Sequence, residues 1–203
     1  MGTTQPIRKQ EQLERFMDYY HSVRPSARNE ALITVGLYTA LRIGDILKLQ
    51  WRDVFDFRQN CFRSHLDVTE QKTGKETTIA LNRHAVKSLY AYKRERRPQP
   101  EDYIFSKATT CGIPLCRSQA YRIVKNAAEH TLCGTNIGCH SLRKTFGYHA
   151  WKQGTPPALL MDIYNHSSYR VTKHYLGIEQ DERDSVFCEI DFSGHTKKKS
   201  VIF

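Results

Sequence analysis

The spacing of apolar and polar residues along the chain predicts a mostly helical protein. Leu13, Phe16, Met17 and Tyr20 recur at the three- and four-residue intervals that place side chains on one face of a helix. The stretch ALITVGLYTA within residues 27–40 is apolar enough for a largely buried helix. Helices are expected over residues 8–23, 27–40, 83–96, 117–130, 141–152, 156–164, 168–176 and 181–189, and a short helical stretch is expected after residues 41–45, up to about Leu49.

A different pattern, with period two, occupies residues 54–81. Thr77, Ile79 and Leu81 alternate with polar residues, which is typical of a half-buried strand. The segment Lys72-Thr73-Gly74-Lys75 predicts a tight hairpin turn between two strands. The fold class is therefore α+β: a mostly helical domain with one small antiparallel β-sheet inserted near residues 54–81, and no linker to a second domain.

Charge and composition narrow the function. The formal net charge of the 203 residues is +10, which favours a polyanionic partner through phosphate neutralisation. The longest apolar run, Ala31 to Leu41, is too short to cross a bilayer, and the N-terminus has no apolar stretch typical of a secretion signal. We therefore expect a soluble, cytoplasmic protein.

The six cysteines give little support for a metal site. None of them forms a Cys-x-x-Cys pair, and a zinc site from Cys111, Cys116, Cys133 and Cys139 would have unfavourable spacings. Reduced, mostly buried thiols are expected instead.

The first segment with candidate chemistry is Arg42-Ile43-Gly44-Asp45, directly after the buried helix. An arginine at a helix end is usually solvated or bonded to terminal carbonyls. Its planar guanidinium is also suited to clamp two phosphate oxygens, with Asp45 placed three residues on to orient it.

The second segment is the predicted hairpin turn. Lys72 and Lys75 flank it and are expected to project from the same face of the sheet. A solubilising turn is the common explanation for such lysines, and an ammonium that enters a DNA groove or gives up a proton is the functional one. Geometry alone does not choose between the two lysines.

The third segment is His140-Ser141-Leu142-Arg143. An offset of three residues places His140 and Arg143 on one face of a helix, with Lys144 beside them. Donors at the start of a helix, where the helix dipole favours anions, suit a phosphate. A capped helix with a surface arginine is the plainer alternative.

The fourth segment runs from His166 to Tyr175. Nine residues on one straight helix would point these two side chains apart, so they converge only if the chain breaks between them. Ser167-Ser168 is predicted to supply that break by capping a new helix. Tyr164, Tyr169 and Tyr148 lie in the same part of the chain and are alternatives to Tyr175 as a nucleophile.

Taken together, the four segments resemble the tyrosine recombinase (phage integrase) family from about residue 10 to residue 190. The matches are TALRIGDIL, QKTGKE, HSLRKTF and NHSSYRVTKHYL. The resemblance departs from the family at Tyr164-Asn165-His166, where members commonly carry Leu-Gly-His. We expect this difference to alter local packing and to leave the chemistry intact.

The resemblance implies a set of site residues and a mechanism. The catalytic residues it implies are Arg42, Lys72, His140, Arg143, His166 and Tyr175, with Asp45 in support. Tyr175 would attack a DNA phosphate and form a 3′-phosphotyrosine, so that the bond energy is kept and no ATP is needed. Arginines and histidines would neutralise the phosphate, so no metal and no cofactor are expected.

The resemblance also implies a domain and partners. Residues 1–203 would be the catalytic domain, with the N-terminal core-binding domain absent, either as an excised fragment or as a naturally short member of the kind represented by fimbrial-switch invertases. The partner would be double-stranded DNA. The protein would bind it as a homo-tetramer and would be a monomer in its absence. A type IB topoisomerase, a DNA-binding regulator without cleavage activity and a basic helical interaction domain are the competing hypotheses.

Overall fold

The computed structural model describes residues 4–107, 110–132 and 136–190. The helices are α1 (Gln10–Asp18), η1 (Tyr19–Val23, a π-helix), α2 (Ala27–Thr39), α3 (Ile43–Ile46), α4 (Trp51–Val54), α5 (Arg83–Arg96), α6 (Arg117–Thr131), α7 (Cys139–Lys152), α8 (Pro157–Tyr164), α9 (Tyr169–Leu176) and α10 (Glu179–Glu189). The strands are β1 (Phe55–Asp56), β2 (Cys61–Phe62), β3 (His65–Thr69), β4 (Glu76–Ala80), β5 (Ser106–Lys107) and β6 (Thr110–Pro114).

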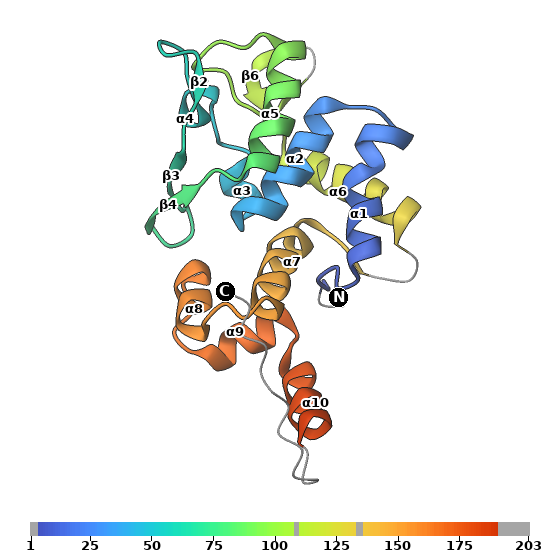
Figure 1. Ribbon diagram of the computed structural model, residues 1–203. Helices are drawn as coiled ribbons and strands as arrows, with labels where there is room; N and C mark the ends of the chain where they lie inside the picture. The colour runs from blue at the N-terminus through green and yellow to red at the C-terminus, as the bar shows by residue number, and fades with distance from the viewer. Residues whose placement is uncertain (1–3, 108–109, 133–135, 191–203) are drawn as a thin grey trace, which may run out of the picture.

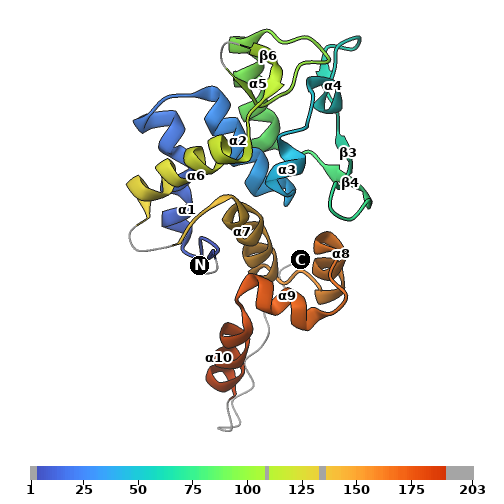
Figure 2. The same cartoon turned by 180° about the vertical axis from the view of Figure 1, so that it is seen from behind.

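Helix α2 is the centre of the larger part of the molecule, with α1, α5 and α6 around it (Figures 1 and 2). Ser26 begins the helix by accepting a hydrogen bond from the Asn29 amide. Leu32 and Ile33 are fully buried, and each stabilises the fold by about 1.5–3 kcal/mol relative to an exposed side chain. The expected buried helix over residues 27–40 is therefore confirmed.

The strands form three separate two-stranded antiparallel pairs rather than the one sheet expected near residues 54–81. The mostly helical α+β class is confirmed, but the β1–β2 and β3–β4 pairs do not join, and the β5–β6 pair was not predicted. In the β3–β4 hairpin, Thr69 pairs with Glu76 and the Glu70 amide donates to the Lys75 carbonyl. The tip is thus a four-residue loop over residues 71–74, wider than the two-residue turn expected, because the Gly74 amide also bonds back to Glu70.

Helix α7 connects the larger part to a smaller C-terminal part (Figure 1). Leu142, near its start, belongs to the main hydrophobic core, whereas Tyr148, one and a half turns later, belongs to a second cluster. That second cluster also contains Leu160, Leu176 and other residues of α8, α9 and the turn after them. The four candidate segments of the sequence therefore fall on both sides of this connection.

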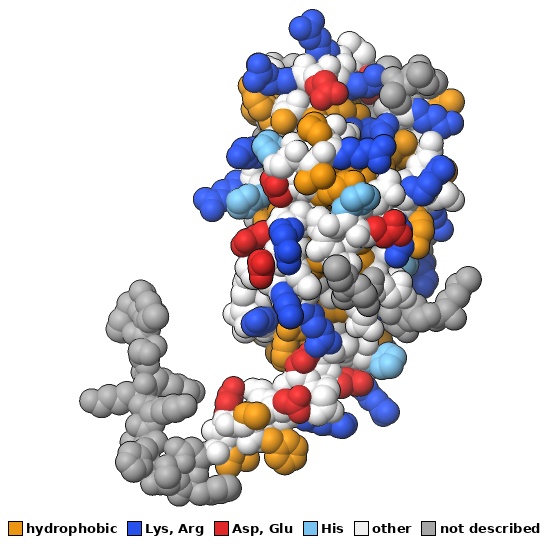
Figure 3. Space-filling view, turned by 90° about the vertical axis from the view of Figure 1, so that its right-hand side faces the viewer, with side chains coloured by type: hydrophobic (Ala, Val, Ile, Leu, Met, Phe, Trp, Pro, Cys, Tyr) orange, Lys and Arg blue, Asp and Glu red, His pale blue; other side chains and the backbone are white. Residues whose placement is uncertain are grey.

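Helix α10 lies outside both cores. It projects from the body below α9 (Figures 1 and 3), and none of its residues is buried. Residues 191–203, which include the lysines at 197–199, lie outside the described residues.

Candidate active site

Arg42 lies in the short turn between the end of helix α2 and the start of α3. The chain turns at Ala40, whose φ of 54° is left-handed, and Arg42 follows in extended conformation as the N-cap of α3. The Arg42 Nη1 atom lies 2.5 Å from an oxygen of Glu70, a residue on the hairpin. The first motif and the second are therefore joined by an ion pair, which the sequence did not predict.

Arg143 lies on α7 at the junction of the two hydrophobic clusters and is only 4% exposed. Its guanidinium donates to the carbonyl oxygen of Ala40, and weakly, at 3.5 Å, to the carbonyl oxygens of Ile163 and Tyr164. It also lies 4.6 Å from the centre of the Tyr164 ring. These partners fix the guanidinium in place, so the plain alternative of a surface arginine is wrong.

The structure separates the two hairpin lysines. Lys75 Nζ pairs with a carboxylate oxygen of Asp162 at 2.6 Å and with its carbonyl oxygen at 3.1 Å, which attaches the hairpin to α8. Lys72 is exposed at the tip of the loop, and its charge acts on His140. The two lysines therefore face different parts of the molecule.

His140 and Lys144 lie on the same helix as Arg143. Partial burial and the charges of Lys144 and Arg143 lower the pKa of His140. Lys144 is 6% exposed. Its ammonium donates to the carbonyl oxygen of Thr4 at 2.8 Å and lies 5.1 Å from the centre of the Tyr175 ring. The N-terminal segment thus contacts the helix that carries the second motif.

His166 and Tyr175 come together as the sequence predicted, because the chain breaks between them. Helix α8 ends at Asn165, and Ser168 caps α9 by accepting from the Val171 amide. The two ring centres are 5.3 Å apart, and His166 Nδ1 lies 3.0 Å from the hydroxyl of Thr172.

The departure at Tyr164-Asn165-His166 has a local explanation. Asn165 adopts a φ of 54°, a left-handed conformation that asparagine tolerates better than most side chains. The chain thereby turns at the end of α8 without a glycine. Tyr164 uses its hydroxyl to donate to the carbonyl oxygen of Arg143 at 2.7 Å.

The electrostatic surroundings of Tyr175 connect it to both arginines. Burial raises the pKa of its half-buried phenol, and the charges of Arg143 and Arg42 oppose that rise. Burial, followed by the charges of the same two arginines, lowers the pKa of His166. Arg42, Arg143, His166 and Tyr175 therefore share one site although they come from three separate segments of the chain, the first, the third and the fourth.

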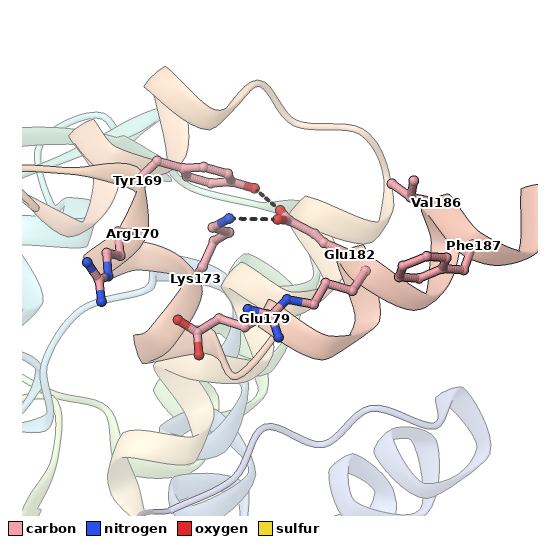
Figure 4. Close-up of a pocket in the computed structure, with 8 residues that line it drawn as sticks. Tyr169, Arg170, Lys173, Glu179, Glu182, Val186 and Phe187 are labelled. Carbon is pink, nitrogen blue, oxygen red and sulfur yellow. Dashed lines mark hydrogen bonds and ion pairs between the residues drawn. The ribbon is translucent and has the colours of Figure 1, made fainter. Parts of the chain in front are cut away.

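The rival tyrosines are engaged elsewhere. Tyr164 is buried, with its hydroxyl bonded to α7. Figure 4 shows Tyr169 directed toward Glu182 of α10, and the hydroxyl donates to that carboxylate at 2.6 Å. Burial and this carboxylate raise the pKa of Tyr169. Tyr148 packs against Arg8, whose guanidinium carbon lies 5.2 Å from its ring centre.

Sequence reasoning missed two contacts, one at the site and one beside the first segment. Glu70 carries the ion pair to Arg42, whereas Asp45, the expected acidic support, accepts a hydrogen bond from the Gln71 amide at 3.1 Å and has no ion pair with Arg42. Arg117, at the start of α6, lies over Gly44 so closely that a Cβ there would be 2.8 Å from its guanidinium. Neither contact leaves a signal in one sequence, because each joins residues more than 25 positions apart.

The described residues contain no cluster of histidine, cysteine and carboxylate side chains arranged to hold a metal ion. Among the cysteines, Cys61, Cys116 and Cys188 are exposed, so the expectation of mostly buried thiols is wrong for these. Within the part of the chain that the structure describes, no helix is both long and apolar enough to span a membrane.

Comparison with known proteins identifies the class that this fold and site define. Residues 8–182 match the model of the phage integrase family, so the chain belongs to that family. It is a tyrosine-type site-specific recombinase, an enzyme that cleaves and rejoins DNA.

Three curated relatives show how the match extends. The chain is 38% identical over 182 residues to the probable integrase/recombinase YoeC of Bacillus subtilis, covering 89% of this chain and 93% of that protein. It is 27% identical to the type 1 fimbriae regulatory protein FimE of Escherichia coli K12, covering 73% and 74% of the two chains. It is 26% identical to the tyrosine recombinase XerD of Mycobacterium leprae, covering 73% of this chain and 47% of that protein, so it spans about half of XerD.

Solved structures give the same fold. The XerA recombinase superimposes with a TM-score of 0.72 at 19% identity, over 94% of this chain and 68% of that one. The XerH recombinase, bound to a palindromic difH substrate, superimposes with a TM-score of 0.71 at 22% identity, over 93% and 55%. At this identity the likeness shows the fold alone.

Proposed function

We propose that Tyr175 is the nucleophile of DNA cleavage and that Arg42, Arg143 and His166 bind the non-bridging oxygens of the scissile phosphate. The observation that supports this most strongly is the shared site: Tyr175 lies against His166 and within the electrostatic field of both arginines. Fixed donors of this kind stabilise the charge that develops in the transition state. Arg143 is well suited to that task because backbone carbonyls hold its guanidinium.

Lys72, His140 and Asp45 complete the proposed machinery. Lys72 protonates the leaving oxygen, because it is the exposed lysine of the hairpin loop, whereas Lys75 is paired with Asp162. His140 has a lowered pKa and is neutral at neutral pH, so it assists proton movement or holds the phosphate. Asp45 supports the site by fixing the base of the hairpin loop through Gln71.

The reaction proceeds by two exchanges at phosphorus. The Tyr175 phenol loses its proton as its oxygen attacks the phosphorus, the bond to the 5′ oxygen breaks, and the leaving oxygen takes a proton to become a 5′-hydroxyl. The 3′-phosphotyrosine keeps the energy of the broken bond. A 5′-hydroxyl from another strand then attacks it and releases the tyrosine. The cationic side chains neutralise the phosphate, so we expect no metal or cofactor requirement.

The substrate is double-stranded DNA, and we infer that the enzyme acts on it as a homo-tetramer and is a monomer in its absence. The net charge of +10 favours DNA, and Figure 3 shows lysine and arginine side chains spread over one face. Val186 and Phe187 of α10 are 58% and 80% exposed, which favours docking of this helix on a neighbouring protomer. Residues 1–203 act as the catalytic domain, and DNA as substrate implies work in the cytoplasm.

The test is a nicked suicide DNA substrate incubated with enzyme in the presence of EDTA. Wild type is expected to form a covalent adduct on a denaturing gel, and Tyr175→Phe none. Tyr169→Phe, which removes a hydroxyl from the same helix, serves as the matched control and should form the adduct. An adduct with Tyr175→Phe would contradict the assignment, and DNA binding without any adduct on varied sequences would favour a binding-only role.

A further inference from the structure

Glu70 is a buried carboxylate at the site that the proposed mechanism does not use. It is 3% exposed and lies at the start of the hairpin loop. One of its oxygens accepts from Arg42 at 2.5 Å and from the Thr73 hydroxyl at 2.8 Å. Its other oxygen lies 3.8 Å from Nη1 of Arg143. A single carboxylate therefore stands between the two arginines that are proposed to hold the phosphate.

The charge state of Glu70 follows from its surroundings. Burial by itself would raise the pKa of this carboxyl, but the hydrogen bonds from Thr73 and Arg42 and the charges of both arginines outweigh it, so the pKa lies below its usual value. Glu70 is thus an anion at neutral pH. Two guanidiniums shielded from water repel each other and lose hydration, and an anion between them offsets both costs.

The two arginines are not held equally. Arg42 is in direct hydrogen-bond contact with Glu70, whereas Arg143 is separated from it by 3.8 Å and is held mainly by backbone carbonyls. An incoming phosphate therefore displaces the carboxylate more easily from Arg143 than from Arg42. Because Thr73 ties Glu70 to the loop that carries Lys72, any shift of Glu70 is passed to that loop.

We propose that Glu70 is a positioning residue and the resident anion of the DNA-free site. It sets Arg42 and the Lys72 loop in place, and it gives up its position beside Arg143 to the scissile phosphate. The inference deepens the proposed function and depends on its assignment of the two arginines. It predicts that loss of the Glu70 charge opens the site to anions but leaves Arg42 and the loop poorly placed for chemistry.

The test compares Glu70→Gln with Asp67→Asn. Both changes remove one negative charge from the hairpin with little change in shape. Asp67 is exposed on β3 and accepts a hydrogen bond from Thr78, so it is a matched control outside the site. Three quantities are measured: the rate of adduct formation on the suicide substrate, DNA affinity by fluorescence anisotropy, and the rise in Tm caused by sodium sulfate relative to sodium chloride at equal ionic strength.

For Glu70→Gln we expect adduct formation to slow by about 10- to 100-fold, as for misplaced catalytic groups. DNA affinity should be unchanged or tighter, and sulfate should raise the Tm more than it does in wild type. Asp67→Asn should behave as wild type in all three. A merely structural role would lower DNA affinity together with the rate and would not increase the response to sulfate, so that result would overturn the inference.

Two further arms keep the test decisive. If Glu70→Gln does not fold, Glu70→Asp keeps the charge on a shorter side chain, and it should regain the wild-type sulfate response with a slower rate. If wild type forms the adduct and Glu70→Gln forms it at the same rate, the inference about Glu70 is wrong and the proposed function is unaffected. Absence of any wild-type adduct would count against the proposed function, whereas the sulfate measurement would still decide whether Glu70 occupies an anion site.

Discussion

The arginines and the tyrosine stand on parts of the molecule that are built differently. Arg42 is flanked by the main hydrophobic core, in which Leu41 and Ile46 are buried, and Arg143 is fixed by three carbonyl groups. Tyr175 lies instead on a helix of eight residues over a small second cluster, followed by a helix with no buried residue. Arg42 therefore has a large scaffold, Arg143 is held by both parts through Ala40 and the end of α8, and the nucleophile has a small scaffold.

This difference matches the physical demands on the two sides. Donors that stabilise a transition state act best when they are fixed before the reaction, because reorganisation then costs nothing at the moment of chemistry. The nucleophile must approach phosphorus and later release it, which a small, lightly packed unit permits. The following variants test how far the two regions behave independently, from the largest expected effect to the smallest.

Arg143→Ala should have the largest effect, because it removes a fixed donor. We expect adduct formation to fall by about 10²–10³-fold. The carbonyl oxygen of Ala40 would also lose its donor, which costs about 1–3 kcal/mol when such a group stays buried. The measurements are single-turnover cleavage and urea unfolding, with the exposed Arg94→Ala as control for loss of one charge. A stable Arg143→Ala enzyme with wild-type cleavage would contradict the role of Arg143.

Gly147→Ala and Gly36→Ala compare how α7 packs against the two parts of the molecule. Gly147 lies on α7 and faces the C-terminal part, whereas Gly36 lies on α2 and faces Leu142 of α7. A Cβ at Gly147 would lie 2.4 Å from the Tyr164 hydroxyl and 2.6 Å from a Leu176 methyl, so the tyrosine-bearing part must shift. A Cβ at Gly36 meets only the end of the Leu142 side chain at comparable distance. We expect Gly147→Ala to lose about 1–3 kcal/mol and also cleavage rate per folded molecule.

Gly36→Ala should lose less stability and keep its cleavage rate. Unfolding curves and single-turnover rates on the same preparations provide the comparison. If both variants slowed cleavage equally, the two regions would not be independent.

The pH dependence of stability should report the two histidines. Their pKa values in the folded chain are lowered below 6.5, so the unfolded chain takes up protons first as the pH falls. The free energy of unfolding should therefore decrease from about pH 6.5 down to the lowered folded pKa values and receive no further loss from these groups below them. The double variant His140→Gln, His166→Gln should flatten this decrease in urea titrations, and an unchanged slope would count against the burial of their rings.

Glu70 also makes the free energy of unfolding decrease as the pH falls, but over a lower pH range than the histidines. Its folded pKa is depressed below 4.5, so its contribution is present above 4.5 and disappears as the pH falls through the folded value. Glu70→Gln should remove this acid-side decrease and leave the histidine window in place.

Asp162→Asn tests the link between the hairpin and α8. The pair with Lys75 is short at 2.6 Å, but the Asp162 side chain is 72% exposed, so we expect less than about 1 kcal/mol of lost stability. If the link also orients the hairpin, cleavage should slow while DNA affinity stays constant. Loss of more than this stability would show that the two regions are joined more tightly than their contacts indicate.

Phe187→Ala should have the smallest effect on the isolated chain. With 80% of the side chain exposed, we expect a change within about 0.5 kcal/mol. The number of protomers on a DNA site, read from native gels, should fall if α10 docks on a neighbour. An unchanged stoichiometry would remove α10 from the proposed assembly.

Much of the local structure was predictable from sequence, because it depends on residues close in the chain. The break between His166 and Tyr175 lies at Ser167-Ser168 as expected, and Ser168 is the residue that caps α9. The period-two pattern placed β4 correctly. The separation of the described strands into three pairs was not predictable, because strand pairing depends on tertiary packing and not on local spacing.

The sequence by itself determined the family, the helical class and the order of the candidate site residues, since each rests on short motifs with fixed spacing. Only the tertiary structure decided which groups meet. Glu70 in place of Asp45 pairs with Arg42, and Lys75 is occupied by Asp162 while Lys72 stays free at the loop tip. The reason is physical: ion pairs and burial depend on distances between segments far apart in the chain, and those distances exist only once the cores have packed.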